Sequence, residues 1–209
     1  MARVHLGHLA ARRQHPVEAQ THFEAALALA RAIGHLRHEG TALAGLADLL
    51  LQRGRADEAA ALNEDLLLLR RRDGNAYNLA LTLRRVAHQA ASRGDTAHAA
   101  ALLAGAQPLV RNAGSLVLLC VWCHEVGSFA ADLRHWDGAV RLLAWASQFR
   151  AQHGYPADDE QARLESAQLN QAREALGDAA YEAARAAGAA FTAGEVLDLA
   201  ARELSDRAR

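Results

Sequence analysis

Glycine and alanine each recur at a fixed spacing of forty residues through three quarters of the chain. The periodic residues are Gly34, Gly74, Gly114 and Gly154 and, in a second register, Ala19, Ala59, Ala99 and Ala139. Such a period is too long for a coiled coil and falls within the range of helix-pair solenoids, in which each unit buries its apolar face against its neighbours. The spacing therefore predicts a repeat protein.

Within each unit, small and apolar residues are spaced so that they share one face of a helix. The third unit illustrates the pattern with Ala99, Leu103 and Ala106. Alanine at such positions lets a partner helix approach closely, so each unit is expected to be an antiparallel helix pair. The predicted helices cover residues 2–13, 17–33, 36–53, 57–73, 76–93, 97–113, 116–133 and 137–153.

Polar turns and glycines mark the ends of these helices. The segments 52–57 and 92–95 are predicted turns between the first and second helices of a pair. The periodic glycines are expected to end each second helix, because glycine enters the left-handed conformation just past a helix end without steric cost.

The forty-residue register is lost after Pro156, where a more polar segment begins. Three helices are expected there: one to about Leu176, a second to Ala187, and a last one opened by a capping box of Thr192 and Glu195. A solenoid needs such a polar end unit to cover its exposed core face. The predicted fold is all-α: an α-α superhelix of four helix pairs over residues 1–156 with a C-terminal helical cap over residues 157–209.

Charge and composition exclude several functions. A net charge of −1 at pH 7 provides no basic face, so we expect no direct contact with nucleic acid. All 23 basic residues are arginine, whereas a P-loop or a Schiff-base enzyme needs lysine. No apolar stretch approaches the roughly 20 residues of a membrane span, and the N-terminus lacks the apolar block of a signal peptide. We expect a cytoplasmic protein without membrane contact.

The recurring pattern of Leu-Gly, a turn glycine and then Ala-x₃-Phe/Leu-x₂-Ala resembles the tetratricopeptide repeat, with longer helices. Residues 137–156, 175–188 and 192–200 further resemble the C-terminal end of bacterial LuxR-type transcriptional regulators with a MalT-like tetratricopeptide region. In those proteins an ATPase module precedes the superhelix, which senses an effector or a protein partner. The resemblance implies that this chain is the sensing arm, as a fragment or as a free-standing relative; self-association stays open.

Tetratricopeptide arrays generally bind on the concave surface lined by the first helix of each pair. Transferred position by position, this rule selects a polar strip: His8, Arg12, Asp48, Gln52, Arg84, His88, His124, Ser128 and Asp132. Its arginines and histidines suit a carboxylate on an acidic peptide, a protein partner or a small effector. Binding should tighten from about pH 8 to pH 6, since histidine ordinarily becomes charged near pH 6.5. The alternative is an ordinary solvated groove.

The segment Cys120-Val-Trp-Cys123-His124 matches the attachment motif of c-type haem and offers three zinc-ligand side chains. The motif lies inside a repeat helix without disturbing its register, so we favour a packed helix with two small thiols and expect no cofactor. A metal- or haem-binding redox protein stays the alternative function. Because the sequence positions no nucleophile beside a base, we predict a non-enzymatic binding module.

Overall fold

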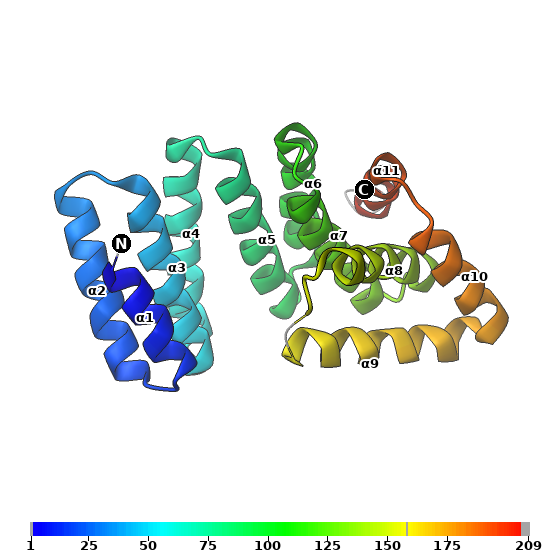
Figure 1. Ribbon diagram of the computed structural model, residues 1–209, viewed down its shortest axis with the longest axis horizontal. Coiled ribbons are helices and arrows are strands. Elements are labelled where there is room, and N and C mark those ends of the chain that lie inside the picture. Colours follow the sequence, from blue (N-terminus) through cyan, green and yellow to red (C-terminus); the bar gives the residue numbers. More distant parts are fainter. Residues whose placement is uncertain (1, 158, 206–209) are drawn as a thin grey trace. The chain divides into compact units, whose positions relative to one another are not determined.

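The computed structural model describes residues 2–157 and 159–205, and these residues form eleven α-helices and no β-strand (Figure 1). The predicted all-α class is confirmed. None of the helices in the described ranges is both long enough and apolar enough to span a membrane. The helices are α1 (Ala2–Arg12), α2 (Pro16–Ala32), α3 (Leu36–Gln52), α4 (Ala56–Asp73), α5 (Ala76–Ser92), α6 (Thr96–Ala113), α7 (Leu116–Asp132), α8 (Trp136–His153), α9 (Asp159–Leu176), α10 (Asp178–Ala189) and α11 (Ala193–Ser205).

The eight helices predicted for the repeats agree with α1 to α8 to within one residue at either end. The capping box at the start of α11 is also confirmed. The Glu195 carboxylate accepts a hydrogen bond from the Thr192 backbone N–H at 2.8 Å, and the Glu195 N–H donates to the Thr192 hydroxyl at 3.3 Å. These ends are fixed by local chemistry, which the sequence displays directly.

The chain divides into two compact units, residues 1–86 and 87–209, with the boundary inside α5. In the first unit, α1 packs on α2, α3 packs on α4, and α3 also contacts α1 and α2. In the second unit, α7 packs on α8, while α11 covers parts of α6, α7 and α8. Helix α10 packs on α8, and α9 contacts α7, α8 and α10. The predicted boundary between repeats and cap at residues 156 and 157 lies inside the second unit and stays a prediction.

The four periodic alanines are buried at the helix contacts. Ala19, Ala59 and Ala99 are 0 % exposed and Ala139 is 1 % exposed. A second set of small residues, on the first helix of each pair, is buried as well: Gly7, Ala47, Ala87 and Gly127. At Gly7 an added Cβ would lie only 2.7 Å from the Phe23 ring, so the helices meet there without room for a side chain.

A left-handed backbone conformation recurs at every twentieth residue from 14 to 154. The positions are Gln14, Gly34, Gly54, Gly74, Gly94, Gly114, Arg134 and Gly154, with φ between 59° and 83°. The predicted left-handed glycines after the second helices are therefore confirmed, and the turns between the helices of a pair share the same conformation. Two of the eight positions carry residues for which it is unfavourable. The next left-handed residue is Gly177 rather than residue 174, so the register slips by three residues in α9.

Replacing Arg134 with glycine should stabilise the protein by about 0.5–1 kcal/mol, because glycine avoids the steric cost of Cβ in the left-handed region. Arg134 is exposed, so little packing is lost. Gly94→Ala should destabilise it by about 1 kcal/mol, because its new Cβ meets no described atom within 4 Å and only the backbone cost remains. Chemical denaturation measures both effects. An Arg134→Gly variant that unfolds at lower denaturant concentration than wild type would contradict this interpretation.

Replacing Ala99 with leucine should cost about 1–3 kcal/mol, because the larger side chain enters a fully buried helix contact. Ala101 lies on the same helix and is exposed, so Ala101→Leu is the matched control and should change stability by less than about 0.5 kcal/mol. Thermal unfolding of the two variants beside wild type measures the difference. If the Ala99→Leu curve overlays that of wild type, the assignment of position 99 to a helix contact is wrong.

Candidate functional site

The nine residues of the predicted polar strip lie on α1, α3, α5 and α7, at three repeat-related positions. The first position holds His8, Asp48, His88 and Ser128, the second holds Arg12, Gln52 and Asp132, and the third holds Arg84 and His124. Five of the nine belong to the first unit and four to the second. The structure therefore describes two separate groups of strip residues, one in each unit.

In the first unit, the strip residue Asp48 has an ionic partner. Its carboxylate pairs with the Arg85 guanidinium of α5 through both oxygens, with Nη2 lying 3.3 Å from Oδ2. The His8 ring is exposed and stands edge-on to Phe23 at a centroid distance of 5.0 Å. Arg84 is half-buried. Arg12 and Gln52 are exposed at the last residues of their helices, where they are open to solvent.

In the second unit, α9 covers part of the strip on α7. The Gln168 side-chain amide donates hydrogen bonds to the Ser128 backbone carbonyl at 3.2 Å and to Asp132 Oδ1 at 3.0 Å. Further along the strip, Nδ1 of the exposed His88 ring lies 3.1 Å from Glu125 Oε1. Three of the four strip residues of this unit, His124, Ser128 and Asp132, thus face groups from α9, a helix that the sequence placed in the cap.

A buried ionic contact of the second unit centres on the Glu165 carboxylate of α9. Arg150 on α8 donates to Glu165 Oε2 at 2.5 Å, and His124 Nε2 lies 3.3 Å from the same oxygen. The side chains of all three residues are at most 12 % exposed. Burial alone would raise the pKa of Glu165, but the contact with His124 and the charge of Arg150 together lower it. Glu165 is therefore ionised at neutral pH.

These contacts repeat along the chain. Arg85, Glu125 and Glu165 are spaced by forty residues, and each contacts a strip residue of the preceding first helix, namely Asp48, His88 and His124. At residue 165, α9 thus contacts the preceding first helix as α5 does at residue 85 and α7 does at residue 125. The small-residue repeat ends before α9. Sequence reasoning did not find Arg150, Glu165 and Gln168. The forty-residue spacing of residues 85, 125 and 165 was the available signal.

The contact between α7 and α9 leaves polar atoms unsatisfied. Within the described ranges, Ser128 Oγ and Gln168 Oε1 are buried without a hydrogen-bond partner. A buried polar atom without a partner costs about 1–3 kcal/mol. The polar surface beneath α9 is therefore not arranged for maximal stability.

The two cysteines of the Cys120-x-x-Cys123-His124 motif are buried in α7. Burial raises the pKa of the Cys120 thiol to about 11, and Cys123, which is 0 % exposed, has a pKa well above its ordinary value for the same reason. Haem attachment and zinc ligation use reactive or deprotonated thiols. No group of three His, Cys, Asp or Glu side chains within the described part of the chain could hold a metal ion. The burial of both thiols is what a packed helix with two small thiols requires.

The thiols should alkylate slowly in the folded protein. A thiol with a pKa near 11 holds roughly 100-fold less thiolate at pH 8 than an ordinary cysteine, so Cys120 should react about 100-fold more slowly with iodoacetamide than in urea. Cys123 should be slower still. Mass spectrometry of the two modified positions over time measures both rates, and equal rates in the folded and unfolded protein would show that the thiols are open to reagents.

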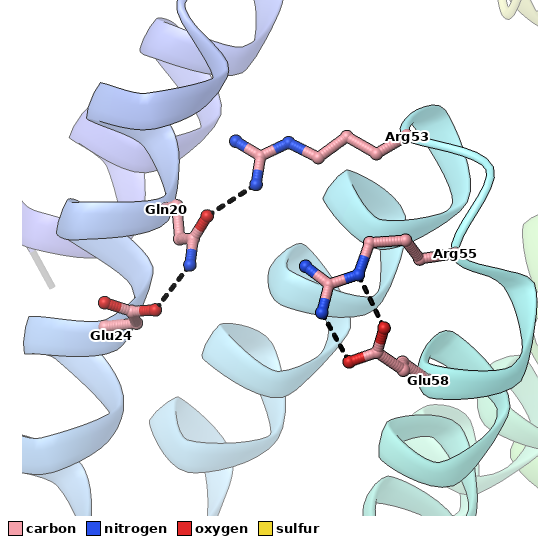
Figure 2. A network of polar contacts seen from close by, with 5 residues as sticks. All are labelled: Gln20, Glu24, Arg53, Arg55 and Glu58. Atoms are coloured by element: carbon pink, nitrogen blue, oxygen red, sulfur yellow. Dashed lines mark hydrogen bonds and ion pairs between the residues drawn. The ribbon is translucent and has the colours of Figure 1, made fainter.

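A separate polar network lies in the first unit (Figure 2). Arg53 in the turn after α3 donates to Gln20 Oε1 at 2.6 Å, and Gln20 donates to Glu24 at 2.7 Å. Arg55 pairs with Glu58 through two hydrogen bonds of 2.5 Å. Gln20, Glu24, Arg53 and Arg55 border a small cleft of about 170 Å³. Four leucines also line this cleft: Leu46, Leu49, Leu50 and Leu62. Because Arg53 and Arg55 already have partners, this cleft is a weaker candidate for a carboxylate.

Comparison of the chain with models of protein families, with curated proteins and with solved structures gives no match. The contacts of the two units are therefore the physical basis for assigning a function. Among these contacts, those on the polar faces of the first helices recur at repeat-related positions.

Proposed function

We propose that the chain is a non-enzymatic binding module of the tetratricopeptide type. In this proposal its helix pairs form an α-α superhelix, which presents the strip residues to a protein, a peptide or a small effector. One observation carries it: α1, α3, α5 and α7 place polar side chains at repeat-related positions on one face and bury small residues on another. A helix with these two faces packs within its pair and keeps a polar surface for recognition.

The resemblance to the MalT-like region of LuxR-type regulators supports a more specific role. We infer that the module is the partner- or effector-sensing arm of a bacterial signalling or transcriptional regulator in the cytoplasm. Its near-zero net charge is consistent with recognition of a protein or a small molecule rather than direct contact with nucleic acid. Self-association of the module is an open part of the proposal.

The ligand chemistry follows from the charged groups of the strip. Arginine and histidine donate charge-assisted hydrogen bonds to carboxylates, and the second unit already holds one carboxylate, that of Glu165, between His124 and Arg150. The proposed partner therefore carries carboxylates. Its affinity is expected to rise between pH 8 and pH 6, the range in which histidine ordinarily becomes charged.

Arg84→Ala should weaken partner binding by about 1–3 kcal/mol, because it removes a charged donor of the strip. Arg71→Ala is the matched control, since Arg71 is exposed on α4, outside the strip. Proteins captured from the native host by wild type and by both variants are identified and quantified at pH 6 and pH 8. We expect carboxylate-bearing partners that are retained by wild type and Arg71→Ala, depleted with Arg84→Ala, and held more tightly at pH 6.

Equal retention by all three proteins would place the binding surface elsewhere, on the second helices or on the C-terminal cap. Loss of the same partners with both variants would instead indicate a general electrostatic attraction. A sample with a Soret band or stoichiometric zinc would favour the redox or metal alternative over a binding module.

A further inference from the structure

Helix α9 is held by two kinds of contact along its length. Towards its C-terminus, Leu169, Ala172 and Leu176 join an apolar cluster with Val140 of α8 and Tyr181 of α10. Towards its N-terminus the described buried side chains are both polar, namely Glu165 and Gln168. The hydrophobic effect therefore anchors one end of α9, while ionic and hydrogen bonds hold the other.

The polar end of α9 makes the contacts expected of a bound acidic peptide. Glu165 places its carboxylate against Arg150 and His124, and Gln168, on the same helical face, binds Ser128 and Asp132. All of these contacts except that of Arg150 are made to strip residues. Glu165 and Gln168, three residues apart on α9, thus bind the strip residues of α7 as two side chains of a helical peptide would.

Helix α9 leaves some polar atoms of this contact unsatisfied. The buried atoms Ser128 Oγ and Gln168 Oε1 lack hydrogen-bond partners in the described part of the chain. The ionic contact is also accessible, because a cleft of about 590 Å³ between α8, α9 and α10 includes Arg150 and Glu165 in its wall. A carboxylate from outside can reach Arg150 through this cleft.

We propose that the surface formed by His124, Ser128, Asp132 and Arg150 is a binding site for an acidic helical peptide, and that the chain's own α9 occupies it. A partner helix with glutamate and glutamine three residues apart replaces Glu165 and Gln168, while the apolar cluster keeps the C-terminal end of α9 in place. This inference rests on the proposed binding function and specifies its partner in the second unit. A segment tethered beside its own binding site competes at an effective concentration in the millimolar range. A partner peptide therefore binds only when its concentration and affinity together outweigh the competition from α9.

The test uses the full-length chain and two labelled probes. One probe is a fluorescein-labelled peptide with the sequence of residues 159–176, and the other is the same peptide with Glu165→Gln. Each is titrated by fluorescence anisotropy with wild type, with Glu165→Gln and with Glu174→Gln. The last variant is the matched control, because Glu174 is an exposed glutamate on the same helix.

The Glu165→Gln protein should bind the unmodified peptide at least about tenfold more tightly than wild type and Glu174→Gln do, because its own α9 no longer supplies the competing carboxylate. The Glu165→Gln peptide should lose most of this binding. Equal affinity of all three proteins for the unmodified peptide, or equal affinity of Glu165→Gln for both peptides, overturns the inference.

Hydrogen exchange shows whether Glu165→Gln releases α9 alone. We expect amide exchange in residues 159–168 to accelerate about tenfold, with α7 and α8 unchanged. Unchanged exchange in residues 159–168 contradicts a releasable α9, and faster exchange throughout the second unit shows that the helix is an integral part of the fold, which overturns the inference as well. In either case partner capture that depends on Arg84 would still support the general binding function.

Discussion

The close approach of two helices at a small residue is the contact on which the repeating part of the chain depends. The four periodic alanines are at most 1 % exposed, and the glycine at position 7 faces Phe23 without room for a Cβ. Such contacts set the distance between helices, and close packing leaves that distance little freedom. Helices α2 to α8 are each 17 or 18 residues long, and together with turns of one conformation they give the forty-residue period. The polar strip is a consequence, because the first helix of each pair turns the same face away from its partner.

Helix positions could be predicted closely because their signals are local. Capping residues such as Thr192 and left-handed glycines such as Gly154 act within one helical turn, so the sequence alone shows them. The left-handed conformations of Gln14 and Arg134 could not be read from residue type, since neither side chain favours that region. Only their register with Gly54 and Gly94 indicates them, so the repeat determines conformation where local preference does not.

The candidate site could be predicted less completely. The strip positions followed from the repeat, but their partners depend on which side chains of other helices face them. Glu165 lies on a polar helix, where a glutamate is ordinarily expected to be exposed to solvent. The fold instead buries it against Arg150. Nothing local distinguishes it from the exposed Glu174 of the same helix. The distinction arises from packing, because burial in a low-dielectric contact strengthens the ionic bonds that Glu165 makes with Arg150 and His124.

The exposed left-handed turns have a consequence for how such a chain can change its length. Turns forty residues apart have the same backbone conformation, so removing or duplicating the segment between two of them rejoins the chain without altering the joint. Each helix then keeps its own neighbours and its own buried face. Removing or adding twenty residues would also keep the turn conformation. It would, however, place a second helix at the position of a first helix, and the polar side of that second helix would then be buried. A surface built from such units therefore grows or shrinks in whole helix pairs and not by a single helix.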